Sequence, residues 1–194
     1  VLTQQILNNL EAQGYTATIF NPDTPQDQLN ALLVIAPESG LSDTTLKQFF
    51  FHTQKASAAL LEIAKSQKTL FATISRMDGT FGLTGPFDEK QILSGSLAGL
   101  AKTASHEWDS VVCRAIDISD TFASPADSAE AIVSTLLTDG PMEIGLSPDK
   151  TIALVLNEEN IEDTAPRAFT KEDIIVISGG ARGVTSQVAN TLAN

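Results

Sequence analysis

The sequence predicts an α/β fold in which a mostly parallel sheet carries helices on both faces. Short apolar runs typical of buried strands recur along the chain, and segments with apolar residues at helical spacing lie between them. A connection between parallel strands needs a crossover of a dozen or more residues, which these helices supply. The length of 194 residues and the hydrophobic content of 42% suffice for a substantial core.

The first third of the chain predicts two helices and two strands. Leu2, Ile6, Leu7 and Leu10 recur at helical spacing, and Gly14 ends that run. Residues 15–20 and 31–36 are typical of strands, the second of them fully buried. The longest helix follows, beginning after a cap at Ser42 or Asp43 and ending near residue 64.

The middle of the chain repeats this alternation. The expected elements are strands at 69–75 and 111–118, a glycine-rich loop at 76–86, helices at 93–108 and 125–138, and two further strands at 142–146 and 151–156.

Composition excludes several classes of protein. A formal net charge of −12 argues against nucleic-acid binding and against docking on an anionic membrane, because both need clustered lysine and arginine. Cys113 is the single cysteine, which excludes an internal disulfide and favours a reducing compartment. The sequence has no apolar run of membrane-spanning length and no leader pattern at Val1. We therefore expect a cytoplasmic chain that begins inside a longer polypeptide.

An acidic stretch divides the chain. Residues 157–166 carry four acidic side chains and little apolar content, which predicts an exposed connector. We expect a first folding unit at residues 1–168. Residues 169–194 would then supply a buried strand at 173–178, a glycine-rich turn and the start of a helix.

That turn is the sharpest functional signal. A buried strand that passes through glycines into a helix is the arrangement that holds a dinucleotide pyrophosphate, since the glycines let the backbone approach and the helix start offers N–H groups. The guanidinium of Arg182 would reach a ribose 2′-phosphate, which favours NADPH over NADH. A plain tight turn with a solvated arginine is the alternative interpretation. The candidate cofactor-binding residues are Ser178, Gly179, Gly180, Arg182, Gly183 and Val184.

Nothing else in the sequence predicts a catalytic or metal site. His52 and His106 lack partners at ligand spacing, and Cys113 lies in an apolar strand that predicts a buried, inert thiol. No serine has the glycine context of a nucleophile elbow.

Three stretches together resemble the ketoreductase region of polyketide synthases, and most of all that of polyunsaturated fatty acid synthases. They are ISRMDGTFG at 74–82, GSLAGLAKTASHEW at 95–108 followed by VCRAID at 112–117, and SGGARGVT at 178–185. Ser178, Gly179 and Gly183 match the Thr-Gly-x-x-x-Gly-x-Gly pattern of short-chain reductases with serine in place of threonine, and Thr185 stands where the last glycine usually does.

The resemblance implies a division of labour between two Rossmann-like halves. Residues 1–168 would be a structural subdomain, like that of short-chain dehydrogenases and reductases but without cofactor binding, and residues 169–194 would begin the catalytic subdomain. The family reaction is NADPH-dependent reduction of a 3-oxoacyl chain on acyl carrier protein. The family's catalytic Ser, Tyr and Lys would lie beyond Asn194, so this chain alone is expected to be inactive and not to bind NADPH.

Two other hypotheses remain open at this stage. A non-catalytic flavodoxin-like or receiver-like interaction module would place clustered acidic residues at the ends of adjacent strands, for which the sequence offers only Asp78 and Asp117. A complete small NADPH oxidoreductase would place the cofactor turn at its first strand, whereas here it comes last. The expected partners are the catalytic subdomain of the same polypeptide, the carrier-bound substrate, and a second copy paired through an open edge at 174–178.

Overall fold

The computed structural model describes residues 1–24, 28–84, 89–158 and 169–193. They form two compact units, residues 1–155 and residues 156–194. In the first unit the elements are α1 (Leu2–Ala12), β1 (Ala31–Ile35), α2 (Asp43–Ala64), β2 (Thr69–Ser75), the 3₁₀ helix η1 (Glu89–Gly95), α3 (Ser96–Glu107), β3 (Val111–Ile118), α4 (Pro125–Leu137), β4 (Glu143–Leu146) and β5 (Thr151–Ala153). The second unit contains α5 (Gly183–Ala193).

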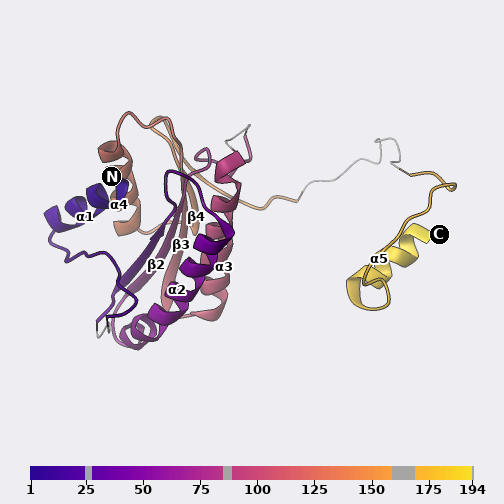
Figure 1. Cartoon of the computed structure of the whole chain (residues 1–194), viewed down its shortest axis with the longest axis horizontal. Coiled ribbons are helices and arrows are strands. Elements are labelled where there is room, and N and C mark those ends of the chain that lie inside the picture. The colour runs from indigo at the N-terminus through magenta and orange to yellow at the C-terminus, as the bar shows by residue number, and fades with distance from the viewer. Residues whose placement is uncertain (25–27, 85–88, 159–168, 194) are drawn as a thin grey trace. The chain divides into compact units, whose positions relative to one another are not determined.

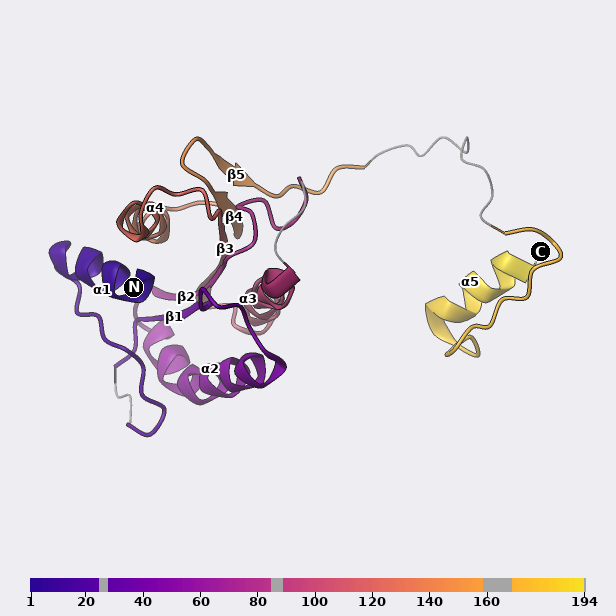
Figure 2. The same cartoon turned by 45° about the horizontal axis from the view of Figure 1, so that its top comes forward.

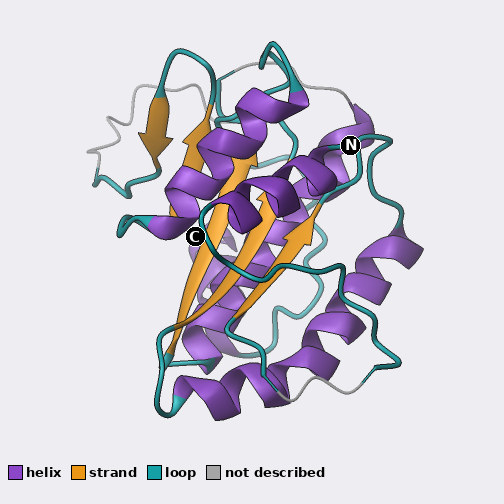
Figure 3. Ribbon diagram, turned by 90° about the vertical axis from the view of Figure 1, so that its left-hand side faces the viewer, coloured by secondary structure: helices purple, strands orange, loops and turns teal. Residues whose placement is uncertain are grey.

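The five strands make one sheet in the order β1-β2-β3-β4-β5. Figure 1 shows β2, β3 and β4 side by side in this sheet. The first four strands are parallel, and β5 returns antiparallel along β4 (Figure 3). The pairing puts Ser75 opposite Asp117 and Asp117 opposite Gly145, so these three residues share the carboxyl end of the sheet.

Helices cover both faces, which confirms the predicted α/β, Rossmann-like class. On one face α2 and α3 pack against Leu32, Phe71 and Cys113. On the other face α1 and α4 pack against Ile74, Ile116 and neighbours in β4 (Figure 2). The alternation of side chains along each strand sends one set to each core.

The connection through α4 has the opposite hand to the two connections before it. The chain steps in the same direction along the sheet from β1 to β2, from β2 to β3 and from β3 to β4. The first two steps pass over one face through α2 and α3, whereas the third passes over the other face through α4. Because crossover connections in parallel sheets nearly all have one hand, this reversal is a distinguishing feature of the unit.

Side-chain caps fix the starts of two long helices. Ser42 is the N-cap of α2, and its Oγ accepts from Thr45 N at 3.2 Å. Ser124 caps α4 in the same way from Asp127 N at 3.2 Å, with Pro125 in the first turn. Of the two caps expected for α2, Ser42 is therefore the one used.

Two predicted strands are wrong. Residues 15–20 form no strand, with Tyr15 and Ile19 exposed, although Phe20 packs against the core of the α2 face. Residues 173–178 also form no strand, and Ile174 and Val176 are each 92% exposed. In both segments the β-favouring side chains are present, but no described strand pairs with them.

Two other expectations need smaller corrections. The helix expected from residue 93 begins as η1 and becomes α-helical at Ser96, and the strand expected at 151–156 ends at Ala153. Most of the expected connector, and the unit boundary expected at residue 168, lie outside the described residues. No helix among the described residues is long and apolar enough to cross a membrane.

Candidate functional site

The predicted cofactor turn lies in the second unit. Gly179 and Gly183 have φ of +73° and +68°, and an added Cβ at either would meet nothing within 4 Å. Backbone conformation, rather than crowding, therefore makes glycine favourable at these two positions. The helix α5 begins at Gly183, so its first N–H groups lie beside the turn.

The structure gathers all the candidate cofactor-binding residues in this short turn, and most are exposed. Ser178, Gly179, Arg182 and Gly183 are exposed, Gly180 is half-buried, and Val184 is 77% exposed. The turn itself fits a phosphate group, because it combines open space, two left-handed glycines and a helix start. The strand that should precede it is not formed, and no residue of α5 is buried.

A different arrangement occupies the carboxyl end of the sheet in the first unit. Asp117, near the end of β3, is fully buried. Its Oδ1 accepts from Ser75 Oγ at 2.7 Å and from Met77 N at 2.9 Å. Its Oδ2 accepts from Phe81 N at 3.0 Å and from Asp78 N at 3.3 Å. Both carboxylate oxygens are therefore filled by donors from β2 and the loop that follows it.

A second carboxylate organises the same loop. Asp78 accepts from Thr80 N at 2.8 Å and Gly82 N at 2.9 Å, and also from the Thr80 hydroxyl. Burial raises the pKa of the Asp78 carboxyl, but hydrogen bonds from Thr80 and Gly82 outweigh it, so the pKa lies below its ordinary value. Asp78 is therefore ionised at neutral pH.

The loop rests directly on the end of β4. A Cβ on Gly79, whose φ is +74°, would lie 2.6 Å from Leu146 O. A Cβ on Gly145 would lie 2.0 Å from Gly79 O, which no side chain tolerates. Two glycines thus allow backbone to cover the carboxyl end of the sheet.

Two cavities flank the loop. One of about 500 Å³ lies on the α1 and α4 side and includes Arg76, Glu38, Asp78 and Asp120 in its lining. Burial lowers the pKa of Arg76 and the nearby Glu38 partly offsets it, while the guanidinium Nε donates to Ala36 O at 3.1 Å. With three acids against one base, this cavity does not suit a phosphate.

The second cavity is smaller and mainly apolar. It has a volume of about 410 Å³ and lies between the loop, α3 and the end of the sheet. Its lining includes Met77, Phe81, Gly95 and Leu154, with the Lys102–Glu143 ion pair of 2.9 Å at its side.

The remaining candidates have structural surroundings. Cys113 is buried, as the sequence predicts, and burial raises the pKa of its thiol to about 11, which disfavours the reactive thiolate. His52 lies near the Phe20 ring, with centroids 6.1 Å apart, and His106 is exposed. Within the part of the chain that the structure describes, no three His, Cys, Asp or Glu side chains are placed to hold a metal ion.

The acidic pair does not make a receiver-like cation site. Asp78 and Asp117 lie close together at the strand ends, as that hypothesis requires. However, the oxygens of both already accept N–H or O–H donors, and a cation site needs free carboxylate oxygens. The sequence singled out both residues but did not predict that Asp117 accepts hydrogen bonds from the loop. The available signal was an acidic residue near the end of one buried strand together with a glycine-rich loop after the neighbouring strand.

Comparison with known proteins finds a relative in sequence and likenesses to solved structures. No family model matches the chain. The relative is a large component of the polyunsaturated fatty acid synthase of Thraustochytrium sp. (strain ATCC 26185 / S-3). The chain is 31% identical to it over 139 residues, a match that includes 67% of this chain and spans 5% of the length of the relative.

One of the similar solved structures is a 4-hydroxyisoleucine dehydrogenase complexed with NADH and succinate. It has a TM-score of 0.39 and 17% sequence identity, covering 71% of this chain and 68% of the dehydrogenase. At this score the likeness adds no argument to the sheet order and helix layers described above.

Proposed function

We propose that this chain is the structural half of a ketoreductase within a multienzyme similar to polyunsaturated fatty acid synthases, followed by the first turn of the catalytic half. The 31% identity to a component of such a synthase supports this assignment. The reaction of the whole ketoreductase would be NADPH-dependent reduction of a 3-oxoacyl group carried on acyl carrier protein.

The main structural support for the proposal is that the chain's own loop after β2 occupies the carboxyl end of the sheet. Open α/β sheets bind ligands in the crevice outside the carboxyl ends of their strands. Here the N–H groups of Met77, Asp78 and Phe81 are already donated to the buried Asp117 carboxylate. The first unit therefore keeps the frame of a nucleotide-binding fold while its own loop fills the binding edge, which suits a bracing role.

The cofactor would be held by the second unit. Ser178, Gly179, Gly180, Gly183 and Val184 would cradle the pyrophosphate, and Arg182 would pair with the 2′-phosphate that distinguishes NADPH. NADPH, when bound, supplies a hydride to the 3-oxo carbon. The turn needs a neighbouring sheet to hold it, and the catalytic subdomain of the same polypeptide would supply that sheet.

Cofactor binding and turnover test the proposal. The 194-residue chain is titrated into NADPH while the nicotinamide fluorescence is followed, and it is then assayed with an acetoacetyl thioester. We expect no saturable binding and no turnover. A longer polypeptide that continues past Asn194 should bind NADPH and reduce the thioester, and Arg182→Ala in it should raise the dissociation constant about tenfold or more, the loss of one bidentate phosphate contact.

Two results would contradict the proposal. Turnover by the 194-residue chain would show that it already contains the catalytic groups. Saturable NADPH binding by this chain that Arg182→Ala weakens would show that the turn already binds the cofactor. That result would contradict a purely structural role.

A further inference from the structure

The buried Asp117 carboxylate has an unusual set of partners for a charged group. It is 0% exposed, yet no lysine or arginine in the described part of the chain forms an ion pair with it. Its partners are one hydroxyl and three backbone N–H groups. Isolated buried charge is costly, so these donors must supply the stabilisation that a counter-ion would otherwise give.

The three backbone donors converge because the loop turns back on itself. Gly79 and Phe81 have φ of +74° and +57°, and Phe81 is the only residue other than glycine with positive φ in the described chain. Gly82, which follows Phe81, is left-handed as well, with a φ of +75°. Left-handed residues within a loop turn its N–H groups toward one concavity, an arrangement that binds anions in many proteins. The strained Phe81 is the residue whose N–H reaches Asp117 Oδ2 at 3.0 Å.

We infer that the loop 76–82 is an oxyanion-binding site whose resident ligand is the chain's own Asp117 carboxylate. Hydrogen-bond donors, backbone shape and exclusion of water are all in place for a carboxylate or a similar oxyanion. The site also lies at the sheet edge where α/β folds bind ligands. This inference is independent of the ketoreductase assignment, because it concerns only what the loop binds.

Chemical rescue tests the inference. Asp117→Ala in the 194-residue chain removes the carboxylate and leaves the space for one, so formate, which has the same three heavy atoms, should enter. We expect the melting temperature of the variant to rise saturably with sodium formate over sodium chloride of equal ionic strength. At tenfold the dissociation constant the rise should be about 3–6 °C. The wild type should show no such difference.

Two variants serve as controls. Asp117→Asn keeps the shape but puts an amide where the anion would sit, so it should be less stable than the wild type and show no response to formate. Asp120→Ala removes an exposed acid from the segment after β3, which lines the same cavity as Asp78, and should behave as the wild type does.

The inference is overturned if formate and chloride act alike on Asp117→Ala, or if Asp117→Asn responds as strongly. Should Asp117→Ala fail to fold in chloride, refolding by dilution provides the readout. Recovery of folded chain should then be several-fold higher in formate, and equal recovery in the two salts would overturn the inference.

Discussion

Gly79 and Gly145 lie at the carboxyl end of the sheet, where neighbouring backbone leaves no room for a side chain at either position. Gly145 has an ordinary negative-φ backbone, yet a Cβ there would lie 2.0 Å from Gly79 O and 2.7 Å from Ile152 Cγ1. Glycine is therefore required at position 145 because neighbouring backbone crowds the place of a side chain. Gly79 combines such crowding with a φ of +74°. Both glycines allow the loop to reach the Asp117 carboxylate.

Substitution of Gly145 should therefore be severe. Gly145→Ala forces the loop away from β4, and we expect the free energy of unfolding to fall by about 3 kcal/mol, the upper range for overpacking. Gly99→Ala is the matched control, because a Cβ there meets nothing within 4 Å and the residue lies inside α3. That change should stabilise by about 0.5–1 kcal/mol through helix propensity. Urea unfolding measures both, and equal effects would refute the crowding argument.

At the scale of elements, the sequence predicted the buried strands best. Residues 69–75 and 111–118 have the predicted bounds, because each is rich in apolar and β-branched side chains and lies between turn residues. Residues 15–20 and 173–178 carry similar β-favouring side chains but form no strand. A strand needs a partner as well as propensity, and partners are not visible in a local pattern.

The two candidate sites also differ in whether local sequence or distant pairing determines them. The turn at 178–184 was predictable, since its positive-φ glycines and its helix start are local features. The donor set around Asp117 was not, because Met77 and Phe81 lie about 40 positions away along the chain. The pairing of β2 with β3 brings them together.

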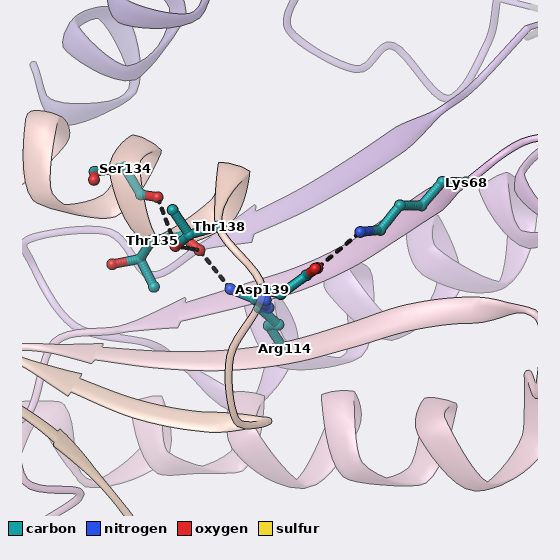
Figure 4. A network of polar contacts seen from close by, with 6 residues as sticks. All are labelled: Lys68, Arg114, Ser134, Thr135, Thr138 and Asp139. Carbon is teal, nitrogen blue, oxygen red and sulfur yellow. Dashed lines mark hydrogen bonds and ion pairs between the residues drawn. The ribbon is translucent and has the colours of Figure 1, made fainter.

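The end of α4 relies on a buried arginine. Arg114 of β3 is 3% exposed, and its Nη1 donates to Thr135 O in the last turn of α4 (Figure 4). Thr138 Oγ1 also donates to Ser134 O at 3.0 Å and to Thr135 O at 3.3 Å, while Lys68 pairs with Asp139 at 2.8 Å. A cation at a helix C-terminus is favourable, but the Arg114 Nε is buried without a hydrogen-bond partner.

Two substitutions separate the packing of Arg114 from its charge. Arg114→Ala should lower the free energy of unfolding by about 2–4 kcal/mol, because it leaves a cavity beneath α4. Arg114→Met fills most of that space, and Thr138 still donates to the exposed carbonyls, so we expect a loss of about 1 kcal/mol or less. Urea unfolding again decides: a methionine variant as unstable as the alanine variant would show that the guanidinium itself stabilises α4.

At the scale of the whole molecule, the two units differ in what they bury. The first unit has apolar cores on both faces of its sheet. In the second unit α5 has no buried residue, and Ile174, Val176, Val184 and Leu192 are between 53% and 92% exposed. A helix of 11 residues is marginal in water without packing, so the second unit depends on a partner surface for stability.

This difference predicts self-association of the 194-residue chain. Among the described residues, no strand pairs with 174–177, a run of large β-branched side chains, and such a segment pairs with another strand when one is available. With no other chain present, a second copy would supply that strand, so sedimentation velocity should show a concentration-dependent shift from monomer to dimer. Val176→Lys places a charge in the edge and should abolish the shift. Leu156→Lys changes an equally exposed residue outside this run and should leave it unchanged. A wild-type chain that stays monomeric at every concentration, or a Val176→Lys variant that dimerises equally, would show that 174–177 does not act as a pairing edge.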